Sequence, residues 1–153
     1  MQGITYKKLK LFLDKYPHGV SWRVKRHCSI IDKHLNPDEE LLYVFAGQYD
    51  NITWSLCNTV VVAITSERLI LGQKYILPGY KFVSITPDLY NDLSVYSGIF
   101  WGTIAIDTIK EIVYVSDLDK ASLPEVETVI TEFMTEKKKE YAQLGKPNSL
   151  WKS

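Results

Sequence analysis

The chain has 153 residues, of which 46% are hydrophobic and 24% charged, and its 18 Lys and Arg balance its 18 Asp and Glu. This length fits one domain, or one domain with an appended segment, and the composition excludes an intrinsically disordered chain. The charge balance argues against a nucleic-acid-binding protein, which usually carries a basic excess.

The N-terminal residues and the hydropathy predict a cytoplasmic protein. Residues 1–10 lack the apolar core of a secretory signal, and no stretch approaches the roughly 18 apolar residues of a membrane span. Cys28 and Cys57 match neither a metal site nor a disulfide framework, and both lie in apolar-periodic stretches. We therefore expect two buried free thiols in a reducing compartment.

The first predicted elements form a helical hairpin over residues 4–35. Apolar residues at helical spacing predict a first helix from about Thr5 to Tyr16 and a second helix that Ser21 caps. Pro17-His18-Gly19 separates the two helices, and Asn36-Pro37 stops the second. The apolar positions are Leu9, Phe12, Leu13 and Tyr16 in the first helix and Val20, Val24, Cys28, Ile31 and Leu35 in the second.

Seven short apolar runs follow between about Leu41 and Val115, each closed by a turn signal, and they predict β-strands. The first run is typical of a strand covered on both faces. The second is rich in β-branched residues, which fit a pleated surface, and it forms a predicted hairpin with the third. The runs cover residues 41–46, 57–65, 68–74, 80–85, 93–96, 100–107 and 112–115.

A strongly amphipathic helix from about Leu123 to Tyr141 is the last predicted element. Ser122 and Glu125 have the spacing of a capping box, in which Glu125 reaches back to the start of the helix. The apolar stripe of this helix can cover the open end of a small twisted sheet. It comprises Leu123, Val126, Val129, Ile130, Phe133 and Met134. Residues 144–153 are expected to form a loose tail.

Two stretches resemble the bacterial pleckstrin-homology-like (PH-like) domain family. Val62–Leu71 (VAITSERLIL) resembles a hairpin of these domains, in which Thr, two residues and Arg-Leu join two hydrophobic strands. Gly102–Asp107 followed by a capping helix fits the same layout. The resemblance implies an α+β fold, a PH-like barrel of two orthogonal antiparallel sheets capped by a C-terminal helix. It covers about Pro37 to Tyr141, so we place the PH-like domain at residues 37–143 and an N-terminal helical hairpin extension at 1–36.

The bacterial domains of this family are non-enzymatic and some form symmetric rings, so the resemblance implies a binding or assembly role. Eukaryotic relatives often bind phosphoinositides through Lys and Arg in the first strand–loop–strand. Here Leu41–Val61 contains no Lys or Arg, and a polyanionic headgroup needs charge-assisted donors. We therefore do not expect the usual phosphoinositide site.

The reactive side chains in the sequence do not form a recognisable catalytic or metal-binding motif. His27 and His34 share a helix face but lack the further ligands of a metal site, so solvated or capping histidines are expected. Cys28 follows His27, and neighbours on a helix do not face each other, which argues against a nucleophile–base pair. Asp117–Asp119 opens like a calcium loop but lacks its Gly and Glu, so its carboxylates are expected in a turn. We expect no metal, no cofactor and no enzymatic activity.

Aromatic residues in predicted loops are the candidate partner-binding residues. Tyr49 and Trp54 lie in a polar loop, and exposed aromatic residues are enriched at protein interfaces. Phe100 and Trp101 stand between two glycines, which suggests a bulge or a strand end. Core packing is the commoner fate of such rings, and an exposed contact patch is the alternative. We predict a module that binds protein and associates with itself as a homo-oligomer.

The first helix supports an alternative function, peripheral association with an anionic membrane. Lys7, Lys8 and Lys10, together with Phe12, make a basic amphipathic segment of the kind that lies on a lipid surface. The basic second helix also permits a helix-turn-helix interpretation, in which the pair reads DNA. We favour a third interpretation, in which the hairpin packs its apolar face on the β core or on another subunit.

Overall fold

The structure, a computed structural model, describes residues 3–49 and 58–144. Within these ranges two helices, α1 (Ile4–Lys15) and α2 (Val24–His34), precede seven strands, and a short 3-10 turn, η1 (Lys120–Ser122), leads into α3 (Leu123–Leu144). The strands are β1 (Leu41–Tyr49), β2 (Thr59–Thr65), β3 (Leu69–Lys74), β4 (Tyr80–Ile85), β5 (Tyr90–Ser97), β6 (Trp101–Thr108) and β7 (Ile112–Asp119). Trp54, Cys57 and the predicted tail beyond Leu144 lie outside the described residues.

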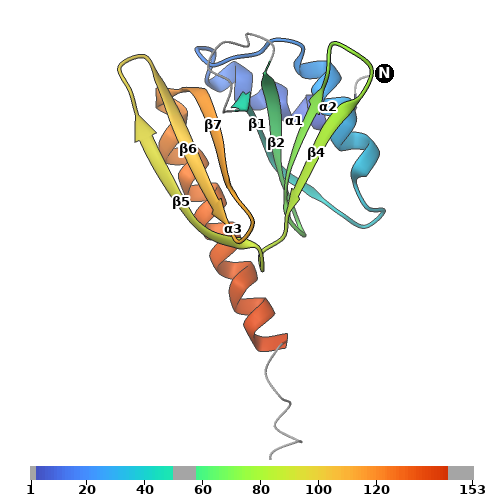
Figure 1. The fold of residues 1–153 in the computed structure, drawn as a ribbon, viewed down its shortest axis with the longest axis vertical. Coiled ribbons are helices and arrows are strands. Elements are labelled where there is room, and N and C mark those ends of the chain that lie inside the picture. The colour runs from blue at the N-terminus through green and yellow to red at the C-terminus, as the bar shows by residue number, and fades with distance from the viewer. Residues whose placement is uncertain (1–2, 50–57, 145–153) are drawn as a thin grey trace, which may run out of the picture.

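The strands form one antiparallel sheet in the order β4-β3-β2-β1-β7-β6-β5, curled into a half-barrel (Figure 1). Strands β1 and β7 pair at Gln48↔Ser116 and Tyr49↔Val115, near the end of β1. Because this junction is narrow, β1–β4 and β5–β7 diverge as two lobes, which correspond to the two sheets of the predicted barrel. The predicted fold class, with its C-terminal helix and N-terminal hairpin, is confirmed.

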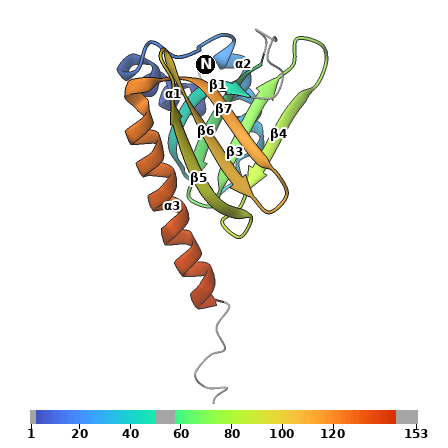
Figure 2. The ribbon, with the colours of Figure 1, turned by 60° about the vertical axis from the view of Figure 1, so that its left-hand side comes forward.

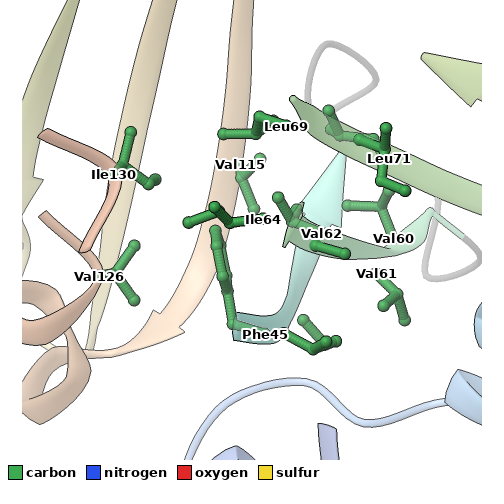
Figure 3. Close-up of a cluster of buried hydrophobic side chains, with 14 of the residues drawn as sticks. Phe45, Val60, Val61, Val62, Ile64, Leu69, Leu71, Val115, Val126 and Ile130 are labelled. Atoms are coloured by element: carbon green, nitrogen blue, oxygen red, sulfur yellow. The ribbon is translucent and has the colours of Figure 1, made fainter. Parts of the chain in front are cut away.

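One hydrophobic core is shared by the sheet and the three helices. Every residue of β2 is buried, because one face of this strand looks into the half-barrel and α2 covers the other. Figure 3 shows Val126 and Ile130 of α3 turned toward Ile64, whereas Val61 lies on the opposite face of β2. The predicted stripe of α3 is confirmed at five positions, since Leu123, Val126, Ile130, Phe133 and Met134 are buried.

Helix α3 lies along the β5–β7 lobe and continues past the end of the sheet (Figures 1 and 2). Its last turns are therefore exposed, and Leu144 at its end is 84% exposed. No helix in the described part of the chain is long and apolar enough to cross a membrane.

The N-terminal hairpin packs on the sheet of its own chain. Asp32 of α2 accepts hydrogen bonds from the N–H and the hydroxyl of Thr5 in α1, at 3.1 and 2.5 Å, and these bonds join the two helices. At Gly72 of β3, an added Cβ would lie 2.8 Å from Cγ1 of Ile31 and 3.2 Å from the carbonyl oxygen of His27. Glycine therefore lets α2 approach the strand closely. Of the two alternatives for the hairpin, packing on the β core or on another subunit, the structure shows the first.

The start of α2 differs from the prediction. The helix begins at Val24, and its N-cap is Arg23 in place of Ser21. Arg23 has a left-handed backbone with φ of 55°, which is uncommon for a residue other than glycine. Its side chain donates to the carbonyl oxygen of Tyr75 at 3.4 Å, and its guanidinium lies 5.3 Å from the ring of Trp22. The bond to Tyr75 ties the helix start to the β3–β4 hairpin.

The start of α3 also differs, because the predicted capping box does not form. The carboxylate of Glu125 accepts hydrogen bonds from Lys15 at 2.5 Å and from the hydroxyl of Tyr43 at 2.8 Å, so it binds other elements. Asp119, expected in a turn, instead ends β7 and accepts a hydrogen bond from the N–H of His18 at 3.1 Å. The beginning of α3 is thus anchored to α1, to β1 and to the α1–α2 loop.

A buried ion pair lies beside the β2–β3 turn. The guanidinium of Arg68 donates to both carboxylate oxygens of Glu39, at 3.0 Å each, and the Glu39 side chain is fully buried. Further N–H groups of Arg68 reach Oγ of Ser84 at 3.0 Å and the carbonyl oxygen of His34 at 2.9 Å. The hydroxyl of Thr65 donates to Glu39 at 2.5 Å. This cluster joins α2, the linker before β1, the β2–β3 turn and β4.

We expect Arg68→Met to lower the free energy of unfolding by about 3 kcal/mol, because it leaves the Glu39 carboxylate buried without its cation. Urea denaturation measures this loss. Lys137→Met, which breaks a more exposed pair with Glu140, is the control and should cost less than about 1 kcal/mol. Adding Glu39→Gln to Arg68→Met should recover part of the stability. A loss that persists in full in the double variant would contradict the ion-pair explanation.

Candidate functional site

An exposed apolar turn joins β5 to β6. We call it the β5–β6 tip, and it comprises Ile99, Phe100 and Trp101, which are 84%, 73% and 50% exposed. The rings of Phe100 and Trp101 lie 5.8 Å apart in a tilted arrangement. In Figure 1 the tip stands at one extremity of the molecule, at the end of the β5–β7 lobe. The commoner expectation, that Phe100 and Trp101 pack in the core, is therefore wrong. The structure shows the alternative, in which both side chains are exposed.

The β5–β6 tip is held in place by short contacts to the rest of the fold. The N–H of Gly98 donates to the carbonyl oxygen of Trp101 at 2.9 Å and closes the turn. An added Cβ at Gly102 would lie 2.4 Å from Cδ1 of Leu123, so the start of α3 packs directly beneath the hairpin. Lys120 donates to the carbonyl oxygen of Ile99 at 3.4 Å. The exposed rings thus stand on a fixed base.

The base of the tip connects to the N-terminal hairpin through Asp119. Trp101 pairs with Asp119 across β6 and β7. The carboxylate of Asp119 accepts from the N–H of His18, at 3.1 Å, and from that of Ala121, at 2.9 Å. Asp119 is 5% exposed, so these bonds replace the water that the carboxylate loses on burial. The base of the tip is therefore hydrogen-bonded to the loop between α1 and α2.

The other predicted contact residues do not join this tip. Tyr49 lies at the end of β1, where it is partly buried and the Nζ of Lys81 stands 4.1 Å from its ring centroid. Trp54 lies outside the described residues. The structure brings Phe100 and Trp101 together and places Tyr49 on a different part of the sheet.

The predicted membrane-binding residues of α1 fall on two faces. Lys7 and Lys10 are exposed, and Lys8 is partly buried. Phe12 points inward, because it is 5% exposed and its ring packs 6.0 Å from that of Phe45. The assignment of Phe12 to a lipid contact is therefore corrected: its helix uses this face to cover β1. The exposed apolar residues of α1 are Ile4 and Leu11.

A second exposed apolar turn, between β3 and β4, was not predicted from the sequence. The turn between β3 and β4 presents Ile76 and Leu77, which are 62% and 76% exposed, and Arg23 donates to the carbonyl oxygen of Tyr75 at its start. The sequence could have indicated this exposed turn, because turns are usually polar and this one carries Tyr-Ile-Leu immediately before Pro78-Gly79. Pro-Gly predicts the turn but does not reveal that its apolar residues lack a partner.

The histidines and the cysteine of α2 have structural surroundings. His27 is fully buried, contrary to the expectation of a solvated or capping residue, and its Nδ1 accepts from the N–H of Lys74 at 2.8 Å. His34 stacks on Phe82 with ring centroids 4.1 Å apart. Burial raises the pKa of the Cys28 thiol to about 12, with a smaller contribution from a nearby carboxylate, so the thiol stays protonated and unreactive.

An open groove of about 410 Å³ lies between the β2–β3 turn, β4 and the second half of α3. Its charged groups are already engaged, since Arg68 binds Glu39 and Lys137 binds Glu140 at 3.2 Å. Among the described residues, no group of three or more His, Cys, Asp or Glu is placed to hold a metal ion. The strongest candidate site in the described chain is therefore an exposed surface and not a cavity.

Comparison with known proteins gives a family match. The family model of the bacterial PH domain matches residues 35–132, which run from the linker before β1 into α3 and leave α1 and α2 outside. A crystal structure of a pleckstrin homology domain from Shewanella amazonensis SB2B is similar, with 18% sequence identity and a TM-score of 0.44, and the match covers 82% of this chain and 97% of that chain. No curated protein sequence matches the chain.

We expect His27 to make the protein less stable as the pH falls. Burial, with a smaller contribution from Arg23, lowers the pKa of His27 to about 4, and the neutral ring accepts the N–H of Lys74. The His27 ring gains a proton near pH 6.5 in the unfolded chain but only near pH 4 in the folded chain. The free energy of unfolding should therefore fall by about 3 kcal/mol across this window.

Urea denaturation of the wild type and of His27→Asn, at several pH values, measures this contribution. The Asn side chain can accept the same N–H but has no proton to gain, so the difference between the two proteins isolates His27 from the carboxylates. Parallel stability curves for the two proteins between pH 6.5 and 4 would contradict the assignment.

Proposed function

The chain belongs to the bacterial PH domain family, and we propose that it is a non-enzymatic module that binds protein through the β5–β6 tip, a second copy of itself being the first partner. Membership of this family supports a binding role in general. The proposal places the module in the cytoplasm, where a buried thiol such as Cys28 stays reduced.

The observation that carries the proposal is the exposure of Phe100 and Trp101 on a fixed base. Exposed aromatic side chains are frequent centres of protein interfaces, because they bury a large apolar area when a partner covers them. Ile99 extends the same apolar surface. No Lys or Arg occurs between Phe82 and Ile109, and Lys120 reaches the tip from η1 by donating to the carbonyl oxygen of Ile99. Two such tips can bury their rings against each other or against a pocket of another subunit.

We expect Phe100→Ser combined with Trp101→Ser to abolish self-association, because it removes the apolar rings without touching the core. Light scattering over a range of protein concentrations measures the mass, and the wild type should reach at least twice the mass of one chain. Ile109→Ser, at an equally exposed position on the β6–β7 turn, is the control and should behave as the wild type. A wild type that stays monomeric at high concentration would defeat the self-association proposal.

Association with an anionic membrane through α1 is the second candidate. It is favoured by the exposure of Ile4 and Leu11, at 57% and 68%, beside the exposed Lys7 and Lys10. Because Phe12 lies in the core, deletion of α1 would damage the fold and is a poor test.

Point variants of the exposed residues give a better test of this second candidate. Lys7→Glu combined with Lys10→Glu should lower co-sedimentation with vesicles of phosphatidylcholine and phosphatidylserine, because both changes reverse charges at the lipid surface. Unchanged co-sedimentation would exclude α1 as the membrane-binding element.

A further inference from the structure

The β5–β7 lobe has one face that the helices leave open. Its other face packs in the core, where Figure 3 shows Val126 and Ile130 of α3 on the side of Val115 in β7. Helices α1 and α2 pack on β1–β4. In Figure 2 the three strands of the lobe lie in front, with α1 and α2 behind the sheet and α3 at one side. We call the open side of these strands the outer face.

The outer face carries aromatic and acidic side chains. Alternate residues of a strand point to opposite faces, so the residues between the buried ones point outward. Tyr96 and Ile112 are 57% and 47% exposed. Trp101 of the β5–β6 tip is on the same side of β6 and is 50% exposed, so the tip continues this face. The members used below are Asp92, Tyr96, Trp101, Asp107, Ile112 and Tyr114.

Two carboxylates lie side by side on the outer face. Asp92 and Asp107 are directly opposite each other in the β5–β6 ladder, where like charges destabilise a sheet. Neither forms an ion pair with another described residue. Strands β5, β6 and β7 contain no Lys or Arg, and Lys110 and Lys120 lie in connections at the ends of the lobe. A cation supplied by a partner would relieve the repulsion between the two carboxylates.

The solvent side of α2 carries the opposite charge. Its other side is buried on the sheet, which leaves Lys25, Arg26 and Lys33 exposed. Asp32, the acidic residue in the sequence of α2, is bonded to Thr5. Residues 1–36 contain eight Lys and Arg and two Asp, whereas the whole chain has no net charge. The rest of the chain therefore has an excess of six negative charges.

We infer that the outer face of the β5–β7 lobe binds the solvent side of α2 in a second copy of the chain. This contact rests on the self-association proposed above and specifies the two surfaces that meet. Lys and Arg of α2 would neutralise Asp92 and Asp107, and aromatic rings such as Tyr96 and Tyr114 also attract these cations. Figure 1 shows α2 on the β1–β4 side of the molecule, away from the β5–β7 lobe, so the two surfaces meet between copies.

A second copy is the partner that matches both surfaces. A nucleic acid would bind the cations of α2 but would leave the paired carboxylates of the outer face unmatched. Helix α2 lies outside the segment that the family model matches, so this contact uses the helices added to the family domain. Because the two surfaces differ, each pair of copies leaves one of each surface open, and assembly continues beyond two copies until a ring closes.

Light scattering of the full chain over a range of concentrations tests this inference. Arg26→Glu with Lys33→Glu, and separately Asp92→Lys with Asp107→Lys, should each raise the dissociation constant about tenfold or more, because like charges then meet. These four side chains lie outside the hydrophobic core, and an unchanged thermal midpoint shows that each variant is folded. Lys138→Glu with Lys139→Glu reverses two exposed charges on α3 and, as the control, should keep the wild-type mass.

An equimolar mixture of the two charge-reversed proteins gives the sharpest test. Neither should associate alone, but every contact between the α2 variant and the lobe variant pairs opposite charges, so the mixture should recover the wild-type mass. A protein that carries all four changes should recover it as well. Contact between two identical surfaces, such as two β5–β6 tips, gives no such recovery.

The inference is overturned if the α2 variant associates like the wild type, or if the mixture keeps the mass of one chain. The proposed function survives either result when the wild type associates and the Phe100 and Trp101 variant does not. A wild type that stays monomeric defeats both. Tighter binding of the wild type to polyuridylate than to a second copy would overturn the inference in favour of nucleic acid.

Discussion

The ion pair between Arg68 and Glu39 holds together parts of the chain that the sheet alone does not join. Burial raises the pKa of the Glu39 carboxyl, but hydrogen bonds from Arg68, Thr65 and the N–H of Asn36 outweigh this and hold its pKa below the usual value. The carboxylate therefore stays charged inside the protein. Because Arg68 also binds the last turn of α2 and β4, the helix is fastened across the β3–β4 hairpin.

This attachment determines what the N-terminal hairpin can do. With its end bound by Arg68, α2 crosses β3 at Gly72, where the strand has no side chain, and its N-cap residue, Arg23, bonds to Tyr75 at the β3–β4 turn. At the other end of the hairpin, His18 binds Asp119 beneath the β5–β6 tip. The added helices thus support both exposed turns, and the candidate binding residues lie on loops carried by a rigid scaffold.

Periodicity in the sequence predicted the elements because burial repeats along each of them. The run from Val60 to Ile64 is apolar at every position since β2 is covered on both faces, and the stripe of α3 recurs at the helical period because one face meets the core. Polar signals were less reliable. Ser122 and Glu125 have the spacing of a cap, yet Glu125 binds Lys15 and Tyr43, which no local rule can foresee.

The sequence by itself determined the order of helices and strands, the covered faces and the likeness to bacterial PH domains, because these depend on residue type and on spacing over a few positions. Only the tertiary structure determined which apolar side chains remain exposed to solvent. Phe12 and Phe100 are both aromatic residues in apolar stretches, but one covers β1 and the other stands in solvent. Phe12 is buried because the folded chain places its ring against that of Phe45 in β1, a contact that no local pattern encodes.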